Sequence, residues 1–169
     1  MSKNFIFFAS VFFSLTLLSQ TKEEALRDAK ITAKATLDSN YKTVLDYTYA
    51  PVLEIMGGKD KALELITKSM NEMKAQGFVF KSADVISCSK IVEEQNQKRC
   101  YIKNTYVMIF NGYRMTSDAY LLGVYNEDKK AWNFIEAKQL SNPMMSSVLP
   151  DFKTSLNIPQ GTMNSEKIN

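Results

Sequence analysis

The hydrophobic period of the chain changes once, at Gly77, and this change limits what the chain can fold into. Between Thr21 and Gln76 apolar residues recur every three or four positions, which is the spacing of amphipathic helices. From Phe78 onward apolar and polar residues alternate, and Val, Ile, Tyr, Phe and Thr dominate, which is typical of half-buried strands. A block of helices followed by a block of strands predicts an α+β fold in which the helices lie on an antiparallel sheet.

Three helices are expected in the first block. Thr21 and Glu24 have the spacing of a capping box, in which a hydroxyl and a carboxylate satisfy free backbone N–H groups at a helix start. Pro51 is expected to end the second helix, because the residue before a proline avoids helical angles, and Gly77 to end the third. The expected helices are residues 21–37, 41–49 and 59–76.

Four strands are expected in the second block. Asn111-Gly112 separates two alternating runs and is the strongest short hairpin signal in the chain, because both residues of such a turn need a positive φ. This turn fixes a register in which Phe110 faces Tyr113 and Tyr101 faces Leu122. With helices on one face, the sheet has to curve, which predicts a cone-like half-barrel. The expected strands are residues 79–93, 98–110, 114–126 and 131–139.

The first twenty residues have the pattern of a secretion signal. Lys3 is followed by an uncharged apolar run from Phe5 to Leu18, and the chain then turns polar at Ser19 and Gln20. The run is shorter than the about 20 apolar residues that a transmembrane helix needs. The sequence therefore predicts a signal peptide at residues 1–20, cleaved near Ser19 or Gln20. The mature chain is expected to be secreted or periplasmic and no longer bound to the membrane.

The remaining residues have the length of one domain. Removing residues 1–20 from a chain of 169 leaves enough residues for a single buried core. After Leu140 the chain loses its period and contains three of its four prolines. We therefore expect one α+β domain at residues 21–140 and an irregular C-terminal extension at residues 141–169.

The composition argues against several classes of function. Lysine and arginine number 21 against 18 for aspartate and glutamate, so neither a nucleic acid nor an anionic membrane is an expected partner. The chain has no histidine, which removes the commonest general base and the usual metal ligand. Gly57-Gly58 lacks the Lys and the Ser or Thr of a phosphate-binding loop. We expect no metal, no other cofactor and no histidine-based catalytic site.

Cys88 and Cys100 are the only cysteines in the chain. Both fall in predicted strands, and a hairpin turn centred near Glu94 would place them opposite each other. A shift of one residue in that register would send their side chains to opposite faces of the sheet. Because a disulfide would persist in an exported protein, the bridged and the reduced states are both compatible with the sequence.

The order of these elements resembles the nuclear transport factor 2-like superfamily, which includes the SnoaL-like proteins. The resemblance covers Glu23 to Leu140 and lies in the order of elements. It implies a cone between helices and sheet; in related enzymes such as ketosteroid isomerase, tyrosine and carboxylic acid side chains in the cone transfer protons. The segments that carry it are LDSNY at 37–41, VLDYTYAP at 44–51, GGKDKA at 57–62 and KAWNFI at 130–135.

Aromatic and acidic residues on the predicted strands are candidates for a ligand site. Asp118 and Tyr120 lie two positions apart on one strand, so their side chains share a face of the sheet. Five aromatic residues at alternating strand positions are expected to gather on one side: Tyr106, Phe110, Tyr120, Trp132 and Phe134. The expected ligand-binding residues are Tyr47, Tyr49, Tyr106, Asp118, Tyr120 and Trp132.

These features favour an exported, non-catalytic binding or interaction module that holds a small apolar or aromatic ligand in the cone. Two other functions fit the same residues. The strands carry apolar residues on both faces, so an exposed sheet face would support a homodimer. Alternatively, Asp118 with Tyr120 or Tyr47 would transfer protons in a small hydrolase or isomerase.

Overall fold

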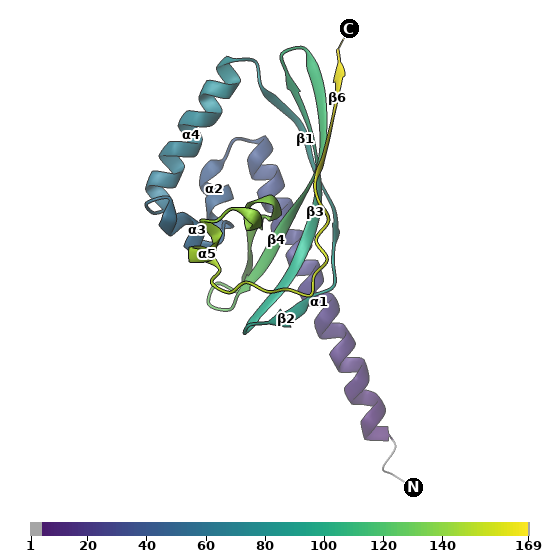
Figure 1. Ribbon diagram of the computed structural model, residues 1–169. Helices are drawn as coiled ribbons and strands as arrows, with labels where there is room; N and C mark the ends of the chain where they lie inside the picture. Colours follow the sequence, from purple (N-terminus) through teal and green to yellow (C-terminus); the bar gives the residue numbers. More distant parts are fainter. Residues whose placement is uncertain (1–4, 169) are drawn as a thin grey trace.

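Helices precede a curved, open antiparallel sheet along the chain (Figure 1). The computed structural model describes residues 5–168, with side chains from residue 21 onward. The signal peptide predicted at residues 1–20 lies outside the part of the chain whose side chains are described. In the described part, no helix is long and apolar enough to cross a membrane.

The predicted α+β fold, with helices before an antiparallel sheet, is confirmed, but the described chain has more elements than expected. The helices before the sheet are α1 (Phe5–Leu37), α2 (Tyr41–Asp46), α3 (Ala50–Ile55) and α4 (Lys59–Ala75). The strands are β1 (Val79–Cys88), β2 (Val92–Glu94), β3 (Gln97–Phe110), β4 (Tyr113–Asn126), β5 (Ala131–Glu136) and β6 (Thr162–Lys167). The 3-10 helix η1 (Ala137–Ser141) and the helix α5 (Met145–Val148) lie between β5 and β6.

The single helix predicted at residues 41–49 is interrupted, because residues 47–49 pair with β5. The Tyr47 carbonyl accepts a hydrogen bond of 2.7 Å from the N–H of Phe134, and the N–H of Tyr49 donates to the Phe134 carbonyl over 3.1 Å. Pro51 does not end a helix here but lies in the first turn of α3, where its missing N–H removes no hydrogen bond.

The sheet has the strand order β1-β3-β4-β5, and the two remaining strands, β2 and β6, lie at its edges. β2 continues the edge beside β1 along β3, and β6 continues the edge beside β5 along β4. The central register is as predicted, since Phe110 pairs with Tyr113 and Tyr101 with Leu122. Asn111 and Gly112 have φ angles of 50° and 76°, as the predicted turn requires. The expected count of four strands is exceeded because residues 79–93 form β1 and β2, and β6 comes from the C-terminal extension.

The inner face of the sheet is packed against α1. Ala25 and Ala29 are fully buried there against Trp132 and Phe134. Gly123 lies opposite: a Cβ at this position would be 3.2 Å from the Trp132 ring and 3.3 Å from that of Phe134. Small residues on the helix and on β4 therefore leave room for two large rings, and side chains fill the space between α1 and this part of the sheet.

The outer face of the same strands is covered by the C-terminal part of the chain. Val148, Leu149 and Leu156 are buried in one cluster with Leu122 and Ile135 of the sheet. Residues 141–169, expected to be irregular, thus include α5 and β6 and supply half of a second core. In this region the C-terminal segment covers the apolar outer face that was expected to bind a second copy of the chain.

The β2–β3 turn holds this C-terminal segment in place through polar contacts. The Oε1 atom of Gln95 accepts a hydrogen bond of 3.2 Å from the N–H of Lys153. Arg99, only 2% exposed, donates to the Lys153 carbonyl over 3.0 Å. Glu94 accepts a hydrogen bond of 2.8 Å from the N–H of Ser155. The turn therefore acts as a clasp on residues 153–155.

The free edge of β5 is closed by α1. The carboxylate of Asp28, 1% exposed, accepts a hydrogen bond of 2.9 Å from the backbone N–H of Trp132. The same carboxylate pairs with Arg27 at 3.0 Å. A buried N–H that has no strand partner thus finds a charged acceptor, which docks the helix on the sheet.

Replacing Asp28 with Ala should destabilise the fold by about 1–3 kcal/mol, because the Trp132 N–H loses its acceptor while it remains buried. The free energy of unfolding in urea measures this effect. The matched control is Asp38→Ala, directly after the last residue of the same helix, which removes an exposed ion pair with Lys34 and should cost less than about 0.5 kcal/mol. Equal losses in the two variants would contradict a docking role for Asp28.

Acidification should weaken the clasp at Glu94. Hydrogen bonds from Ser155 and Thr154 lower the pKa of Glu94, so its ionised form stabilises the fold above the ordinary glutamate pKa of about 4.3. That contribution is lost as the pH falls through the lowered pKa of the folded protein. Glu94→Gln keeps an acceptor oxygen but cannot titrate. Urea unfolding from pH 7 to pH 2 should therefore show a stability advantage of the wild type over Glu94→Gln that disappears at the acidic end, and a constant difference would contradict the clasp.

Candidate functional site

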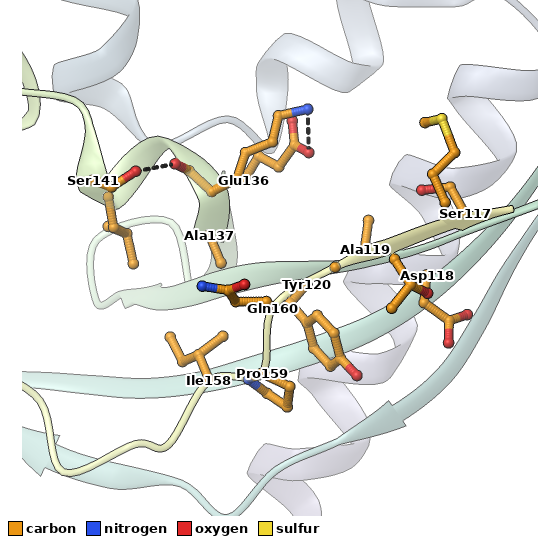
Figure 2. A pocket seen from close by; sticks show the side chains of 15 residues that line it. Ser117, Asp118, Ala119, Tyr120, Glu136, Ala137, Ser141, Ile158, Pro159 and Gln160 are labelled. Carbon is orange, nitrogen blue, oxygen red and sulfur yellow. Dashed lines mark hydrogen bonds and ion pairs between the residues drawn. The ribbon is translucent and has the colours of Figure 1, made fainter.

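A hollow of about 700 Å³ lies along the edge of β4 (Figure 2). The pairing of β5 with β4 ends at Leu121 and Glu136, and the pairing of β6 with β4 ends at Asp118 and Thr162. The hollow opens between these two ends. The walls come from three parts of the chain, which are residues 117–120 of β4, residues 136–138 with 140 and 141 around η1, and residues 158–163 before and within β6. The site thus depends on where two edge strands begin and end.

Much of the lining is apolar. The lining residues with apolar side chains or rings are Ala119, Tyr120, Ala137, Leu140, Ile158, Pro159 and Met163. In Figure 2, Asp118 and Tyr120 extend from one side of β4, while Glu136 and Ala137 lie on the other side near η1. The hollow therefore reaches around the sheet edge and does not lie under the helices.

The charged groups in the lining are already paired. Asp118 forms an ion pair with Lys103 at 2.7 Å and accepts a hydrogen bond of 2.6 Å from the Thr105 hydroxyl. Glu136 pairs with Lys138 at 2.8 Å. Each carboxylate thus has its own ammonium group, and the two pairs add no net charge to the site.

Asp118 is poorly suited to hold a proton near neutral pH. The hydrogen bonds from Lys103 and Thr105 lower the pKa of Asp118 below its ordinary value. A carboxyl that acts as a general acid near neutral pH needs the opposite, a pKa that is raised by its surroundings. The geometry therefore makes Asp118 an ionised cross-strand partner.

Four of the five aromatic residues expected to gather on one side of the sheet do so, on the inner face, and Tyr120 is the exception. Tyr120 pairs with Lys103, whereas Tyr106 pairs with Ser117, so Tyr120 and Tyr106 lie on opposite faces. On the outer face the Tyr120 ring meets Tyr101 edge-on, with ring centroids 5.8 Å apart. Since Trp132 and Phe134 pack against α1 on the inner face, the sheet separates Tyr120 from the rest of the expected set.

The two aromatic candidates on the inner face are packed or hydrogen-bonded within the fold. Trp132 is fully buried, and its ring lies 5.4 Å from that of Tyr125. The hydroxyl of Tyr106 accepts a hydrogen bond of 3.0 Å from the side-chain amide of Asn104, and burial raises the pKa of Tyr106. Neither residue lines the hollow.

Tyr47 and Tyr49 also lie away from the hollow, on either side of the bridge to β5. Tyr47 packs against the inner core, and Tyr49 against the outer one. The Tyr49 hydroxyl accepts a hydrogen bond of 3.2 Å from Gln97. Of the six residues that the sequence nominated, Asp118 and Tyr120 are brought to the hollow.

Cys88 and Cys100 are buried, free thiols on the same face of the sheet. The β2–β3 register, if extended, would pair Cys88 with Lys103, but residues 89–91 leave the ladder and Cys88 pairs with Ile102. Cys100, two positions from Ile102, is thus a diagonal neighbour of Cys88. The hydrogen bond between the thiols and burial raise the pKa of Cys100. A disulfide between them stays a prediction.

Residues 158–163 contribute to the hollow but were expected to be an irregular tail. Gly161 passes so close to β4 that a Cβ would lie 2.7 Å from the Asp118 carbonyl oxygen. The sequence signal for this close approach was Pro159-Gln160-Gly161, a break directly before a short run of strand-forming length.

Within the described residues, no cluster of three or more Cys, Asp or Glu side chains could hold a metal ion, and the chain has no histidine. No protein-family model, no curated protein and no solved structure matches this chain.

Proposed function

We propose that this protein is a non-catalytic binding module that holds a small, neutral, apolar or aromatic molecule in the hollow beside β4. The observation that carries the proposal is the hollow itself, whose volume of about 700 Å³ falls within the range of about 300–1,000 Å³ that is usual for small-molecule sites. The apolar part of a ligand would contact Tyr120, Leu140 and Ile158, and the burial of its apolar surface would favour binding.

The charges of the site support a neutral ligand and a non-catalytic role. Asp118 and Glu136 are each neutralised by a lysine, so an ionic ligand would meet no unpaired opposite charge. The lowered pKa of Asp118 gives the alternative of a hydrolase or isomerase using Asp118 with Tyr120 less support than binding has.

A homodimer through the sheet is the second function that we propose. The apolar residues Val79 and Ile86 of the edge strand β1 are 44% and 53% exposed. The C-terminal segment covers the outer face around Leu122 and Ile135. Such a contact would therefore use β1 and the part of the outer face that this segment leaves uncovered.

We also propose that the chain has the cone-like architecture of the nuclear transport factor 2-like superfamily. Helices followed by a curved antiparallel sheet support this assignment. The C-terminal segment on the outer face would then be an addition of this chain to the shared architecture.

A neutral aromatic probe should bind in the hollow. Titration of the ¹⁵N-labelled full chain with indole should shift the amide resonances of Tyr120, Ala137 and Ile158. Ala137→Leu, which fills part of the hollow, should weaken binding by about tenfold or more, in line with the about 1–3 kcal/mol that overpacking costs. Ala75→Leu adds the same atoms at an exposed position at the end of α4 and should leave binding unchanged. Equal affinity of Ala137→Leu and Ala75→Leu for indole would contradict the proposed site.

The native mass of the protein purified from the exported fraction tests the proposed export and the second function together. The expected result is a chain that has lost its first 19 or 20 residues, because the N-terminal pattern is that of a cleaved signal. A full-length mass would refute the cleavage. A dimer mass would favour the sheet contact, and a loss of two daltons would assign a disulfide to Cys88 and Cys100.

A further inference from the structure

The β3–β4 hairpin determines which peptide groups of β4 point toward which edge. In a hairpin with a two-residue turn, the residues that flank the turn, here Phe110 and Tyr113, exchange backbone hydrogen bonds. Hydrogen-bonded pairs alternate along an antiparallel ladder, so odd-numbered residues of β4 point their N–H groups at β3 and even-numbered residues point away from it. The Gly112 carbonyl agrees with this parity, since on the far edge it accepts a hydrogen bond of 2.8 Å from Ile168.

Tyr120 is the even-numbered residue that falls between the two edge strands. Asp118 is paired with Thr162 of β6, and Leu122 with Ile135 of β5. Neither ladder includes Tyr120: the pairs between β4 and β5 end at Leu121 and Glu136, and those between β4 and β6 end at Asp118 and Thr162. Tyr120 lines the hollow, so its N–H faces the space in which a ligand would lie.

The hollow therefore occupies a position that a carbonyl of a neighbouring strand would normally fill. A carbonyl oxygen in the plane of the sheet is the acceptor that a strand N–H is oriented to meet. Because the nearby carboxylates Asp118 and Glu136 already have lysine partners, a neutral acceptor fits better than an anionic one. An amide oxygen is the neutral carbonyl that proteins pair with such a donor throughout their sheets.

We propose, building on the function proposed above, that the ligand is a neutral amide with an apolar or aromatic body, and that its carbonyl oxygen accepts a hydrogen bond from the backbone N–H of Tyr120. The apolar body lies against Leu140 and Ile158. β6 starts only at Thr162, so its pairing with β4 stops short of Tyr120.

The test compares two probes that differ in the carbonyl group alone, acetanilide and N-ethylaniline. Both are titrated into the ¹⁵N-labelled full chain at pH 7.5, where both are neutral. Acetanilide should move the Tyr120 amide proton downfield and slow its exchange with solvent, whereas N-ethylaniline should shift the lining residues without either effect. Benzoate, an anionic acceptor, should bind more weakly than acetanilide.

A pair of variants tests the same donor from the protein side. Tyr120→Pro removes the N–H, which belongs to no ladder pair with β5 or β6, and should weaken acetanilide binding by about tenfold, the effect of one neutral hydrogen bond. Because both probes also lose the contact with the Tyr120 ring, the decisive result is the loss of the preference for acetanilide over N-ethylaniline. Tyr120→Phe keeps the N–H and should preserve the preference for acetanilide. If Tyr120→Pro does not fold, the comparison of the two probes on the wild type decides.

The outcomes separate this inference from the function on which it rests. If both probes bind in the hollow and the Tyr120 amide proton responds to neither, or to both alike, the amide assignment is overturned and the apolar site stands. If indole and both probes fail to shift the lining residues, the proposed function itself fails.

Discussion

The hydrogen bond from the Trp132 N–H to the buried carboxylate of Asp28 is the interaction on which the arrangement of the fold depends. It joins the first helix to the last strand of the inner core, across more than a hundred residues of chain. Because it occupies the free edge of β5, together with the pairing of Phe134 to residues 47–49, that edge is closed to partners. Burying the Asp28 carboxylate is tolerated because it accepts the hydrogen bond of the Trp132 N–H, which has no partner on a neighbouring strand. The ion pair with Arg27 offsets part of the cost of burying the charge.

The docking of α1 fills the part of the inner face around Trp132 and Phe134, and the hollow lies elsewhere, along the edge of β4. Ala25, Ala29 and Gly123 are small enough to let Trp132 and Phe134 close the core beneath the helix. On the outer face, the clasp of Glu94, Gln95 and Arg99 positions the C-terminal segment, which then returns to the sheet as β6. β5 and β6 pair with opposite halves of β4 and not with each other, and the hollow lies between them.

Much of the fold was predictable from the sequence because its signals are local. The change of period at Gly77 separates helices from strands, and Asn111-Gly112 fixes the pairing of β3 with β4 residue by residue. The site was less predictable. Asp118 and Tyr120 were identified from their spacing on one strand, but Trp132 and Tyr106 were nominated because an alternating aromatic pattern is the same for a packed core as for a cavity wall.

The sequence by itself determined the fold class, the central register and therefore the face of the sheet on which each residue of β3 and β4 lies, since a two-residue turn sets all of these locally. Only the tertiary structure decided that residues 89–91 leave the ladder and bring Cys88 beside Cys100 on one face. It likewise decided that residues 141–168 cover the outer face and that the N–H of Tyr120 is left between two strands. These features depend on where segments far apart in the chain stop pairing, and packing sets those limits, not the pattern of neighbouring residues.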